Sequence, residues 1–325
     1  IAEWCGQLTL FQRTPSSIDF RGNGPTDPAW YAALEPGWQQ ARQDNFTSIL
    51  SGGQEAIDLV ADGWTDIAKG VSPPIGEVPS PEAAQLAGLL RMEQTRGRIE
   101  QTVRDKATAE ALKPWYHYFC KRPAFHDEFL ETFNRPNVTL VDTAGQGVER
   151  ITPKGEVVAG KEYELDCIVY ATGFDFLMEF QRESRFDIKG RDGLELSEHW
   201  REGPRTRFGL HTDRFPNLFF LRLAQAGHGA NYTQTVDEQT AYIAHAIGQC
   251  LEKRAETVEA TSEVVDAWVA EVIEKAAPRQ AFLETCTPGH YNYDANPARA
   301  RFALLNELYG GGAVAYFAML RQYRA

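Results

Sequence analysis

Two pairs of polar residues in this sequence have the chemistry to bind an anion. Arg13 and Thr14 follow residues 7–12, an alternating segment rich in strand-forming residues. At the carboxyl end of a strand, an arginine beside a hydroxyl can bind a 2′-phosphate and so select NADP over NAD. Lys121 and Arg122 lie next to an aromatic stretch, where two cations can hold an anionic cofactor or a developing negative charge. Taken alone, each pair is explained more simply as solvated surface residues.

A short apolar segment near the middle of the chain ends in a glycine. Residues 165–170 read Leu-Asp-Cys-Ile-Val-Tyr, and Ala171, Thr172 and Gly173 follow them. The run is too short for a helix and rich in β-branched and aromatic residues, which predicts a buried strand. Glycine lets the backbone turn closely at the end of such a strand, and ligands of open α/β sheets bind at that end. The sequence therefore predicts a ligand contact at this turn.

A glycine-rich turn follows a second predicted strand. Residues 215–223 form an apolar run that predicts a buried strand, and residues 226–231 read Ala-Gly-His-Gly-Ala-Asn. A helix is expected to begin at this turn, whose backbone N–H groups can approach a flavin or a phosphate. His228, within the turn, fits an exposed loop residue as well as it fits a catalytic one.

The other elements follow from periodicity, capping residues and turn residues. Ser80, Pro81 and Glu82 provide an N-cap, a first-turn proline and a first-turn acid for a long polar helix. We predict a strand at 138–141, a hairpin of strands at 148–152 and 157–165, helices at 38–50, 54–62, 81–105, 107–112, 231–252 and 262–277, and a short amphipathic helix at the end of the chain.

The composition limits the class of protein. The 325 residues are 43% hydrophobic and 24% charged, which is the balance of a soluble globular protein of one large or two ordinary domains. No apolar run approaches the length of a membrane span, and the mean hydropathy is -0.41. A net charge of -12 argues against nucleic acid as the main ligand. We therefore expect no membrane and no nucleic-acid partner.

The cysteines and histidines carry little further signal. The five cysteines are odd in number and scattered, which predicts free thiols in a reducing compartment. The chain shows no signal-peptide pattern, so we expect a cytoplasmic protein. The seven histidines lack metal-ligand spacing, and we expect no structural metal.

Several segments, in this order along nearly the whole chain, resemble the class B flavoprotein monooxygenases, specifically the Baeyer–Villiger monooxygenases. Each segment is modest, but their joint order is specific. The last of them and the glycine-rich tail look like the branch that acts on large or cyclic ketones. The matching segments are residues 11–15, 44–47, 111–116, 119–123, 133–138, 165–175 and 286–291.

The resemblance implies an α/β fold with remnants of two Rossmann-like dinucleotide-binding domains, one for FAD and one for NADP, and a helical insertion. Residues 1–19 would end one part of the NADP-binding domain, 20–114 would form the helical insertion, and 115–143 would return to the NADP-binding domain. Residues 144–325 would form the C-terminal part of the FAD-binding domain. The implied reaction converts a ketone, cyclic or bulky, to an ester or lactone with NADPH and O₂.

The resemblance also implies roles for single residues. Arg122 matches the arginine that stabilises the negatively charged peroxyflavin and later contacts the nicotinamide. Lys121 matches a lysine at the 2′-phosphate of NADPH, with Arg13 and Thr14 as its partners. The expected cofactor-binding residues are Arg13, Thr14, Lys121, Ala171, Thr172, Gly173, Gly227, Asn231 and Tyr232. The expected substrate pocket contains His228, Gly229, Ala230, Pro288 and Tyr291, the last two on a mobile segment that closes over the substrate.

The chain departs from the family's pattern at its glycine motifs. The FAD fingerprint, the NADP fingerprint and the signature between them are absent. We therefore expect the C-terminal portion of a longer enzyme, with the N-terminal half as a partner, and we expect this chain alone not to hold FAD firmly. Two alternatives stay open at this point: a flavin monooxygenase that oxygenates nitrogen or sulfur, and a non-catalytic fragment without cofactor.

Overall fold

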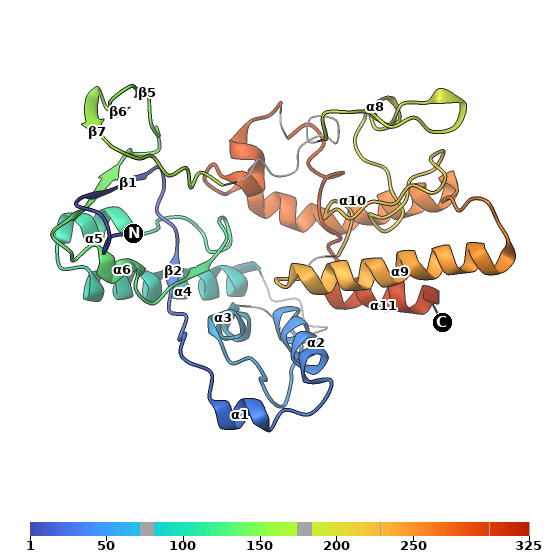
Figure 1. Cartoon of the computed structure of the whole chain (residues 1–325), viewed down its shortest axis with the longest axis horizontal. Helices are drawn as coiled ribbons and strands as arrows, with labels where there is room; N and C mark the ends of the chain where they lie inside the picture. Colours follow the sequence, from blue (N-terminus) through green and yellow to red (C-terminus); the bar gives the residue numbers. More distant parts are fainter. Residues whose placement is uncertain (72–80, 174–183, 228, 299, 325) are drawn as a thin grey trace. The chain divides into compact units, whose positions relative to one another are not determined.

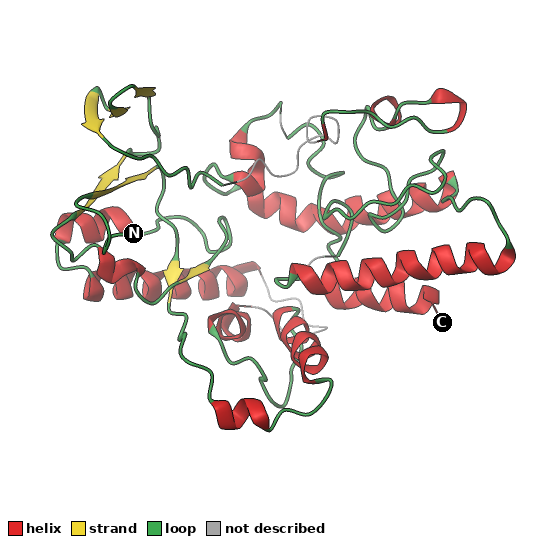
Figure 2. Cartoon of the chain, in the orientation of Figure 1, coloured by secondary structure: helices red, strands yellow, loops and turns green. Residues whose placement is uncertain are grey.

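The structure is a computed structural model in which the chain divides into two compact units (Figure 1). Helices dominate both units, and every described strand lies in the first unit (Figure 2). The first unit contains residues 1–33, 62–71 and 81–173, and the second contains residues 34–61 and the described residues from 184 onward. The residues that the structure describes are 1–71, 81–173, 184–227, 229–298 and 300–324.

The first unit is built on two parallel strands. β1 (Leu8–Gln12) pairs with β4 (Val138–Asp142), with Leu8 opposite Val138. Parallel strands need a long crossover connection, and helices occupy much of it here. These helices are α1 (Pro28–Ala32), α3 (Gly63–Val71), α4 (Pro81–Thr102), α5 (Lys106–Leu112) and α6 (Phe129–Thr132).

Side chains from three of these helices form the core of the first unit. Ile99 of α4, Leu112 of α5 and Leu130 of α6 are at most 3% exposed. They pack with Leu10 of β1 and Leu140 of β4. Each buried side chain of this size contributes about 1.5–3 kcal/mol relative to an exposed one. The helical cover therefore fixes where the carboxyl ends of both strands lie.

Short strands complete the first unit. β2 (Ile18–Asp19) pairs in parallel with β3 (Ala124–Phe125). β5 (Arg150–Thr152), β6 (Gly155–Val158) and β7 (Lys161–Glu164) form an antiparallel sheet. The predicted two-stranded hairpin is therefore wrong in its second strand. Ala159 and Gly160 both have positive φ, at 49° and 74°, and they fold residues 157–165 into a second tight turn.

The second unit is helical. Its core includes Trp268, Tyr316 and Leu320, each fully buried, packed with Phe208 and Tyr242. The C-terminal helix α11 (Gly312–Arg324) runs beside α9 (Tyr232–Lys253), as Figure 1 shows. The other helices are α2 (Trp38–Leu50), α8 (Leu196–His199) and α10 (Ser262–Glu284), with 3₁₀ helices η1 (Arg191–Gly193) and η2 (His290–Ala295).

Most helices agree with the sequence prediction. α2 has the predicted bounds, and α4, α5 and α9 differ from theirs by at most three residues. The predicted N-cap Ser80 lies outside the described residues. α10 is longer than predicted and continues through Pro278. The bounds of these helices could thus be predicted from the local sequence to within a few residues, except at the end of α10.

The helix predicted at 54–62 is wrong. The Asp58 carboxylate accepts from the backbone N–H groups of Val60 and Ala61, at 3.0 and 2.7 Å. Such local bonds offer the backbone an alternative to a helix. The Asp62 carboxylate accepts from the Trp64 N–H at 2.9 Å, and α3 begins at this point instead.

The two predicted buried strands are also wrong. Residues 165–170 pair with no described strand, and Val169 and Tyr170 are 68% and 69% exposed. Residues 215–223 form no strand either, although Phe215 and Phe220 are buried. An apolar run becomes a strand only where neighbours complete its hydrogen-bond ladder. An apolar pattern predicts that a segment is buried, but it does not show whether neighbouring strands are present to pair with it.

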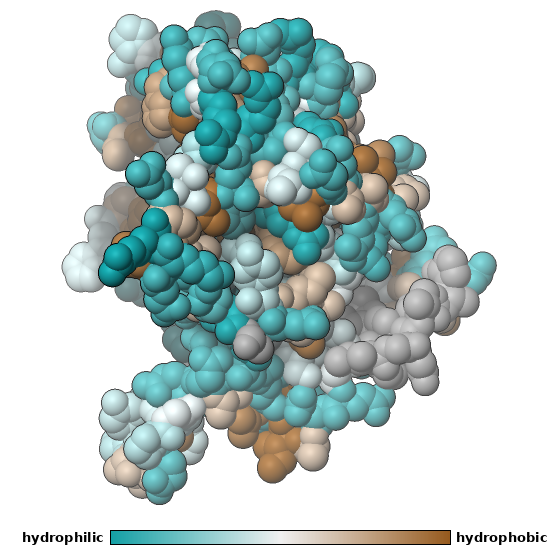
Figure 3. Space-filling view, turned by 90° about the vertical axis from the view of Figure 1, so that its right-hand side faces the viewer, coloured by the Kyte–Doolittle hydropathy of each residue, from teal (hydrophilic) through white to brown (hydrophobic). Residues whose placement is uncertain are grey.

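The surface is largely polar. Figure 3 shows one face on which hydrophilic side chains predominate and hydrophobic ones occur in small groups. Among the described helices, none is both long enough and apolar enough to cross a membrane. Cys5, Cys167 and Cys250 are free thiols, as predicted.

Candidate functional site

Arg13 and Thr14 lie at the carboxyl end of β1. The strand ends at Gln12, which confirms the element on which the prediction for this pair depended. Thr143, which follows β4, donates to the Gln12 carbonyl from its N–H at 2.8 Å and from its hydroxyl at 2.9 Å. These bonds tie the ends of the two parallel strands together. Arg13 is exposed and Thr14 is half-buried, so an anion in solution can reach the guanidinium.

Tyr116 connects the second cationic pair to the segment after β1. Its hydroxyl donates to the Pro15 carbonyl at 3.0 Å and accepts from the Ser17 N–H at 3.1 Å. Burial raises the pKa of this hydroxyl to about 12, so it stays protonated and able to donate at neutral pH. Lys121 Nζ lies 5.6 Å from the centre of the Tyr116 ring. The structure thus brings Lys121 close to the segment that follows Arg13.

Arg122 contacts an aromatic ring. Its guanidinium carbon lies 5.2 Å from the centre of the Trp64 ring, on α3. Trp64 in turn packs on Phe125, with ring centres 4.9 Å apart. The buried Pro123 restricts the Arg122 backbone to extended conformations. In the described part of the chain, no carboxylate pairs with Arg122.

Ala171, Thr172 and Gly173 are exposed at the end of the described part of the first unit. Gly173 has φ +88°, a conformation that favours glycine, and open space surrounds it. Among the described residues, no hydrogen bond, ion pair or ring contact joins this segment to Lys121 or Arg122. The structure therefore does not bring these predicted site residues together, and their contact with a cofactor stays a prediction.

The glycine turn of the second unit packs against α11. A Cβ atom on Gly227 would lie 2.2 Å from the Cβ of Tyr316, which is shorter than any real contact. Glycine at this position therefore lets the backbone lie directly on the helix. Gly229 and Ala230 are half-buried, and His228 lies outside the described residues.

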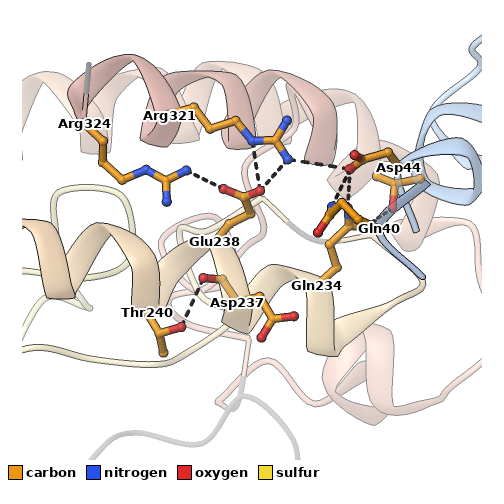
Figure 4. Close-up of polar contacts among 9 residues, drawn as sticks. Gln40, Asp44, Gln234, Asp237, Glu238, Thr240, Arg321 and Arg324 are labelled. Carbon is orange, nitrogen blue, oxygen red and sulfur yellow. Dashed lines mark hydrogen bonds and ion pairs between the residues drawn. The ribbon is translucent and has the colours of Figure 1, made fainter. Parts of the chain in front are cut away.

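The turn leads into α9, whose first turn is held by α2. Asn231 is the N-cap, and its side chain accepts from the Gln234 N–H. The Gln234 amide donates to the Asp44 carboxylate at 2.9 Å (Figure 4) and also bonds to the Thr47 hydroxyl. Residues 44–47, one of the segments behind the resemblance, thus contact the start of α9. Tyr232, the next predicted residue, is exposed.

The loop predicted to close over a substrate precedes and includes η2. Pro288 is exposed, and Tyr291 is half-buried with the Arg279 guanidinium carbon 5.4 Å from its ring centre. Asn292 donates to the Cys286 carbonyl at 3.1 Å, which ties the loop to the end of α10. The positions are those of an accessible surface loop, and its closing motion stays a prediction.

A shallow hollow at the start of α10 contains none of the predicted site residues. It is lined by Asp213, Arg214 and residues 259–263. Asp213 accepts from the Ser262 hydroxyl at 2.8 Å and lies 2.9 Å from the His199 Nε2. Both partners bond to the carboxylate and not to each other, so the imidazole does not activate the serine as a nucleophile. This group ties α8 to the start of α10.

Comparison with known proteins places these features in a family. No family model matches the chain. Pentalenolactone D synthase of Streptomyces exfoliatus is 48% identical over all of this chain and 57% of its own length. A Baeyer–Villiger monooxygenase of Streptomyces coelicolor is 40% identical over all of this chain and 54% of its own length. The chain is related to the Baeyer–Villiger monooxygenases.

Solved structures support the same relationship. A polycyclic ketone monooxygenase from Thermothelomyces thermophila matches with a TM-score of 0.87 and 38% identity, over 99% of this chain and 55% of that protein. A steroid monooxygenase bound to NADP matches with a TM-score of 0.74 and 27% identity, over 99% of this chain and 61% of that protein. The resemblance to Baeyer–Villiger monooxygenases and their α/β fold is thus confirmed. The chain spans about half the length of the relatives it matches.

Sequence reasoning missed two residues of this Baeyer–Villiger relative that support the candidate site. One is Trp64, which fell just after a wrongly predicted helix. The other is Gln225, which is fully buried directly before the glycine turn, with φ +61°. Its amide accepts from the Thr206 N–H at 2.9 Å and donates to the Pro204 and Leu305 carbonyls, at 2.6 and 3.0 Å. The sequence signal that could have identified Gln225 is a polar residue between two alanines, directly after an apolar run.

Proposed function

We propose that this chain takes part in the Baeyer–Villiger oxidation of a ketone. In that reaction ketone, O₂, NADPH and a proton give an ester or lactone, water and NADP⁺, and one oxygen atom enters the bond beside the carbonyl carbon. The observation that carries the proposal is Arg122, an exposed arginine in an aromatic and basic segment, whose guanidinium carbon lies 5.2 Å from the centre of the Trp64 ring. The relatives named above supply the reaction class.

NADPH is the first proposed cofactor. Arg13 follows the carboxyl end of a parallel strand, and Lys121 lies near the Tyr116 ring, whose hydroxyl bonds to the segment after Arg13; two cations in this arrangement suit a 2′-phosphate. The Thr14 hydroxyl beside them can add a hydrogen bond to the same phosphate. A matching steroid monooxygenase is bound to NADP. We accordingly propose that β1 and β4 belong to a Rossmann-like NADP-binding domain.

FAD is the second proposed cofactor. When bound, the flavin accepts electrons from NADPH and uses them to activate O₂. The start of α9 fits such a group, because the glycine turn brings backbone closely past α11 and the helix N-terminus favours negative charge. Gly227, Asn231 and Tyr232 are proposed to lie there, and the exposed segment from Ala171 to Gly173 is proposed as a further contact.

Arg122 is the proposed catalytic residue. Its guanidinium can stabilise negative charge that develops as oxygen attacks the ketone carbonyl. Such a charge acts more strongly where water is excluded. Gly229, Ala230 and the loop with Pro288 and Tyr291 are proposed to line the substrate pocket and exclude water. His228 is proposed to line the same pocket on the basis of the sequence alone.

The substrate is proposed to be a bulky or cyclic ketone. One solved match is named a polycyclic ketone monooxygenase, and another a steroid monooxygenase. The curated relatives are nearly twice as long as the part this chain matches. We therefore propose the N-terminal half of the same enzyme as the partner of this chain, with residues 144–325 in its FAD-binding domain. A cytoplasmic location stays a prediction.

The decisive test replaces Arg122 in the flavin-containing enzyme that carries this sequence. We expect Arg122→Ala to lower ester formation by about 10²–10³-fold, since one electrostatic stabiliser is lost. Flavin content should not change. Arg150→Ala, an exposed arginine on β5, is the matched control and should retain activity.

Other results of these experiments would change the proposed function. Ketone turnover that survives Arg122→Ala would refute the proposed role of Arg122. Oxygenation of amines or thioethers in place of ketones would favour a nitrogen- or sulfur-oxygenating enzyme. A protein that never binds flavin would favour the non-catalytic alternative.

A further inference from the structure

Gln225 is the residue directly before the glycine turn, and its side chain makes four hydrogen bonds. The amide oxygen accepts from the Thr206 N–H at 2.9 Å and from the Thr206 hydroxyl at 2.6 Å. The amide nitrogen donates to the Pro204 and Leu305 carbonyls, at 2.6 and 3.0 Å. Because Gln225 is fully buried, each of these bonds satisfies a polar group that would be costly to leave unpaired.

The backbone of Gln225 is held by two further hydrogen bonds. Its N–H donates to the Glu307 carbonyl at 2.7 Å, and its carbonyl accepts from the Trp268 indole N–H at 3.0 Å. Its φ angle is +61°, a region that residues other than glycine seldom adopt. A residue stays in such a conformation only where the surrounding structure determines it. Here Trp268 and the segments 204–206 and 305–307 do so.

Gln225 determines where the glycine turn starts. The next residue, Ala226, is fully buried, and its carbonyl accepts from the Tyr309 N–H at 3.0 Å. Gly227 follows, and a Cβ atom at this position would collide with the side chain of Tyr316 on α11. The turn therefore has no room to move toward α11, and the bonds of Gln225 fix the backbone that leads into it.

A side-chain amide suits this position because it carries an acceptor and two donors on one planar group. Two donors, both on Thr206, face its oxygen, and two backbone carbonyls face its nitrogen. An ionised carboxylate of the same shape would accept hydrogen bonds but donate none. All of these partners belong to the described part of the second unit. The bonds around Gln225 are thus complete within this chain.

We propose that Gln225 is a positioning residue for the reaction: it sets the path of the glycine turn and, through the turn, the orientation of the ketone beside the flavin. This inference rests on the proposed function, since it takes Gly227 as a flavin contact and Gly229 and Ala230 as part of the substrate pocket. An unsymmetrical ketone can receive the oxygen atom on either side of its carbonyl. A displaced turn changes which side lies next to the reacting oxygen, so Gln225 bears on which of two isomeric products forms.

The test uses the flavin-containing enzyme that carries this sequence, with dihydrocarvone, an unsymmetrical cyclic ketone, as the probe. Two quantities are measured: the ratio of the two isomeric lactones, and kcat/KM per bound flavin. Gln225→Glu keeps the shape and the acceptor oxygen of the side chain, but it offers at most one donor to the two carbonyls. We expect this variant to change the lactone ratio and to lower kcat/KM by about tenfold, because the ketone is held in a less productive geometry.

Further variants separate positioning from general effects. Thr206→Val removes one bond to the amide and should change the ratio in the same direction but less, whereas Thr206→Ser should match the parent. Asn217→Asp makes the same amide-to-acid change at an exposed residue that also has positive φ, at 59°, and that bonds to the Glu256 carbonyl. It should leave the ratio unchanged. Leu196→Ala removes a fully buried side chain that packs with Phe215, so it should lower thermal stability without changing the ratio.

Gly227→Ala displaces the turn from its other side, because the added methyl group collides with Tyr316. If Gly227→Ala changed the lactone ratio and Gln225→Glu did not, the inference would fail while the proposed function stood. If Leu196→Ala changed the ratio as Gln225→Glu does, lost stability would explain the effect and the inference would be wrong. If the parent enzyme formed no lactone, or if Gly227→Ala changed neither measurement, the proposed function of this turn would itself fail.

Discussion

At the scale of single residues, a buried polar atom without a partner can identify a pH-sensitive position that no motif predicts. His211 is 4% exposed, and its ring packs against Phe219 and Tyr242, with centres 4.9 and 5.4 Å away. Its Nε2 atom has no hydrogen-bond partner among the residues that the structure describes. A buried imidazole in such a place is far more stable neutral than charged. Burial accordingly lowers the pKa of His211 to about 4.

This pKa predicts how stability depends on pH. In the unfolded chain His211 binds a proton below pH ~6.5, whereas the folded chain resists it until about pH 4. The unfolded state therefore binds more protons between these values, and the free energy of unfolding falls as the pH drops through this window. A shift of this size corresponds to roughly 3 kcal/mol. Urea unfolding between pH 7.5 and pH 4 measures it.

His211→Phe is the matching variant, since a third ring fits between Phe219 and Tyr242 without titrating. We expect its stability to fall less than that of the parent over the same pH range. The carboxylate of Asp213 also titrates, but hydrogen bonds from Ser262 and His199 lower its pKa below the usual value, outside this window. An unchanged pH profile in His211→Phe would show that another group is responsible.

At the scale of elements, an ion cluster around the buried Glu238 carboxylate fixes α11 to α9. Glu238 of α9 accepts from Arg321 Nε and Arg324 Nη2 of α11, each at 2.9 Å (Figure 4). The same Arg321 lies 3.6 Å from Asp44 of α2. Hydrogen bonding to Glu238 raises the pKa of Arg321. Because Tyr316 of α11 supports the glycine turn, this cluster bears on how α9 begins.

Glu238→Gln should therefore destabilise the second unit. It leaves two arginines facing a neutral amide, and we expect a loss of about 2 kcal/mol. This is less than for a fully buried pair, since the Arg321 side chain is 47% exposed. Asp237→Asn is the control: it removes the same charge from the adjacent, exposed position and should change stability by less than about 0.5 kcal/mol. If the two changes lowered the free energy of unfolding equally, the loss of one negative charge would explain the effect, and the ion cluster would not.

The elements also show what the sequence could predict. The residues of α2 and α9 carry a helical period and, for α9, a capping asparagine, and both helices form where expected. The failures were residues 165–170 and 215–223, whose apolar runs depend on ladder partners elsewhere. Helices satisfy their own backbone hydrogen bonds, whereas strands do not. Local sequence therefore specifies helices better than strands.

The same distinction applies to the candidate site, where the sequence could predict some features and not others. Arg13 and Thr14 follow a strand that the sequence predicted correctly, so their place at its end was predictable. The contact between Arg122 and Trp64 joins residues far apart in sequence, and it depends on how α3 packs on Phe125. No spacing rule reports such a contact. Sequence motifs thus indicated which cationic residues belong to the candidate site, but only the fold shows which side chains contact them.

At the scale of the whole molecule, the 325-residue chain by itself lacks a phosphate-binding glycine fingerprint. A dinucleotide needs backbone N–H groups gathered at such a turn to hold its pyrophosphate. The net charge of -12 adds no general attraction for an anionic cofactor. The start of α9 offers one helix terminus, which is worth little without a phosphate cradle.

We therefore expect the chain, expressed and purified alone, to carry no visible flavin absorption band, even after incubation with FAD. Adding the N-terminal portion of a matching relative as a second polypeptide should restore the band, if that portion supplies the missing cradle. Thermal unfolding of the chain alone should be unaffected by FAD, because a ligand raises stability only when it binds the folded state. A stoichiometric flavin band in the isolated chain would contradict this reasoning. It would place a cofactor cradle within residues 1–325 that no glycine motif marks.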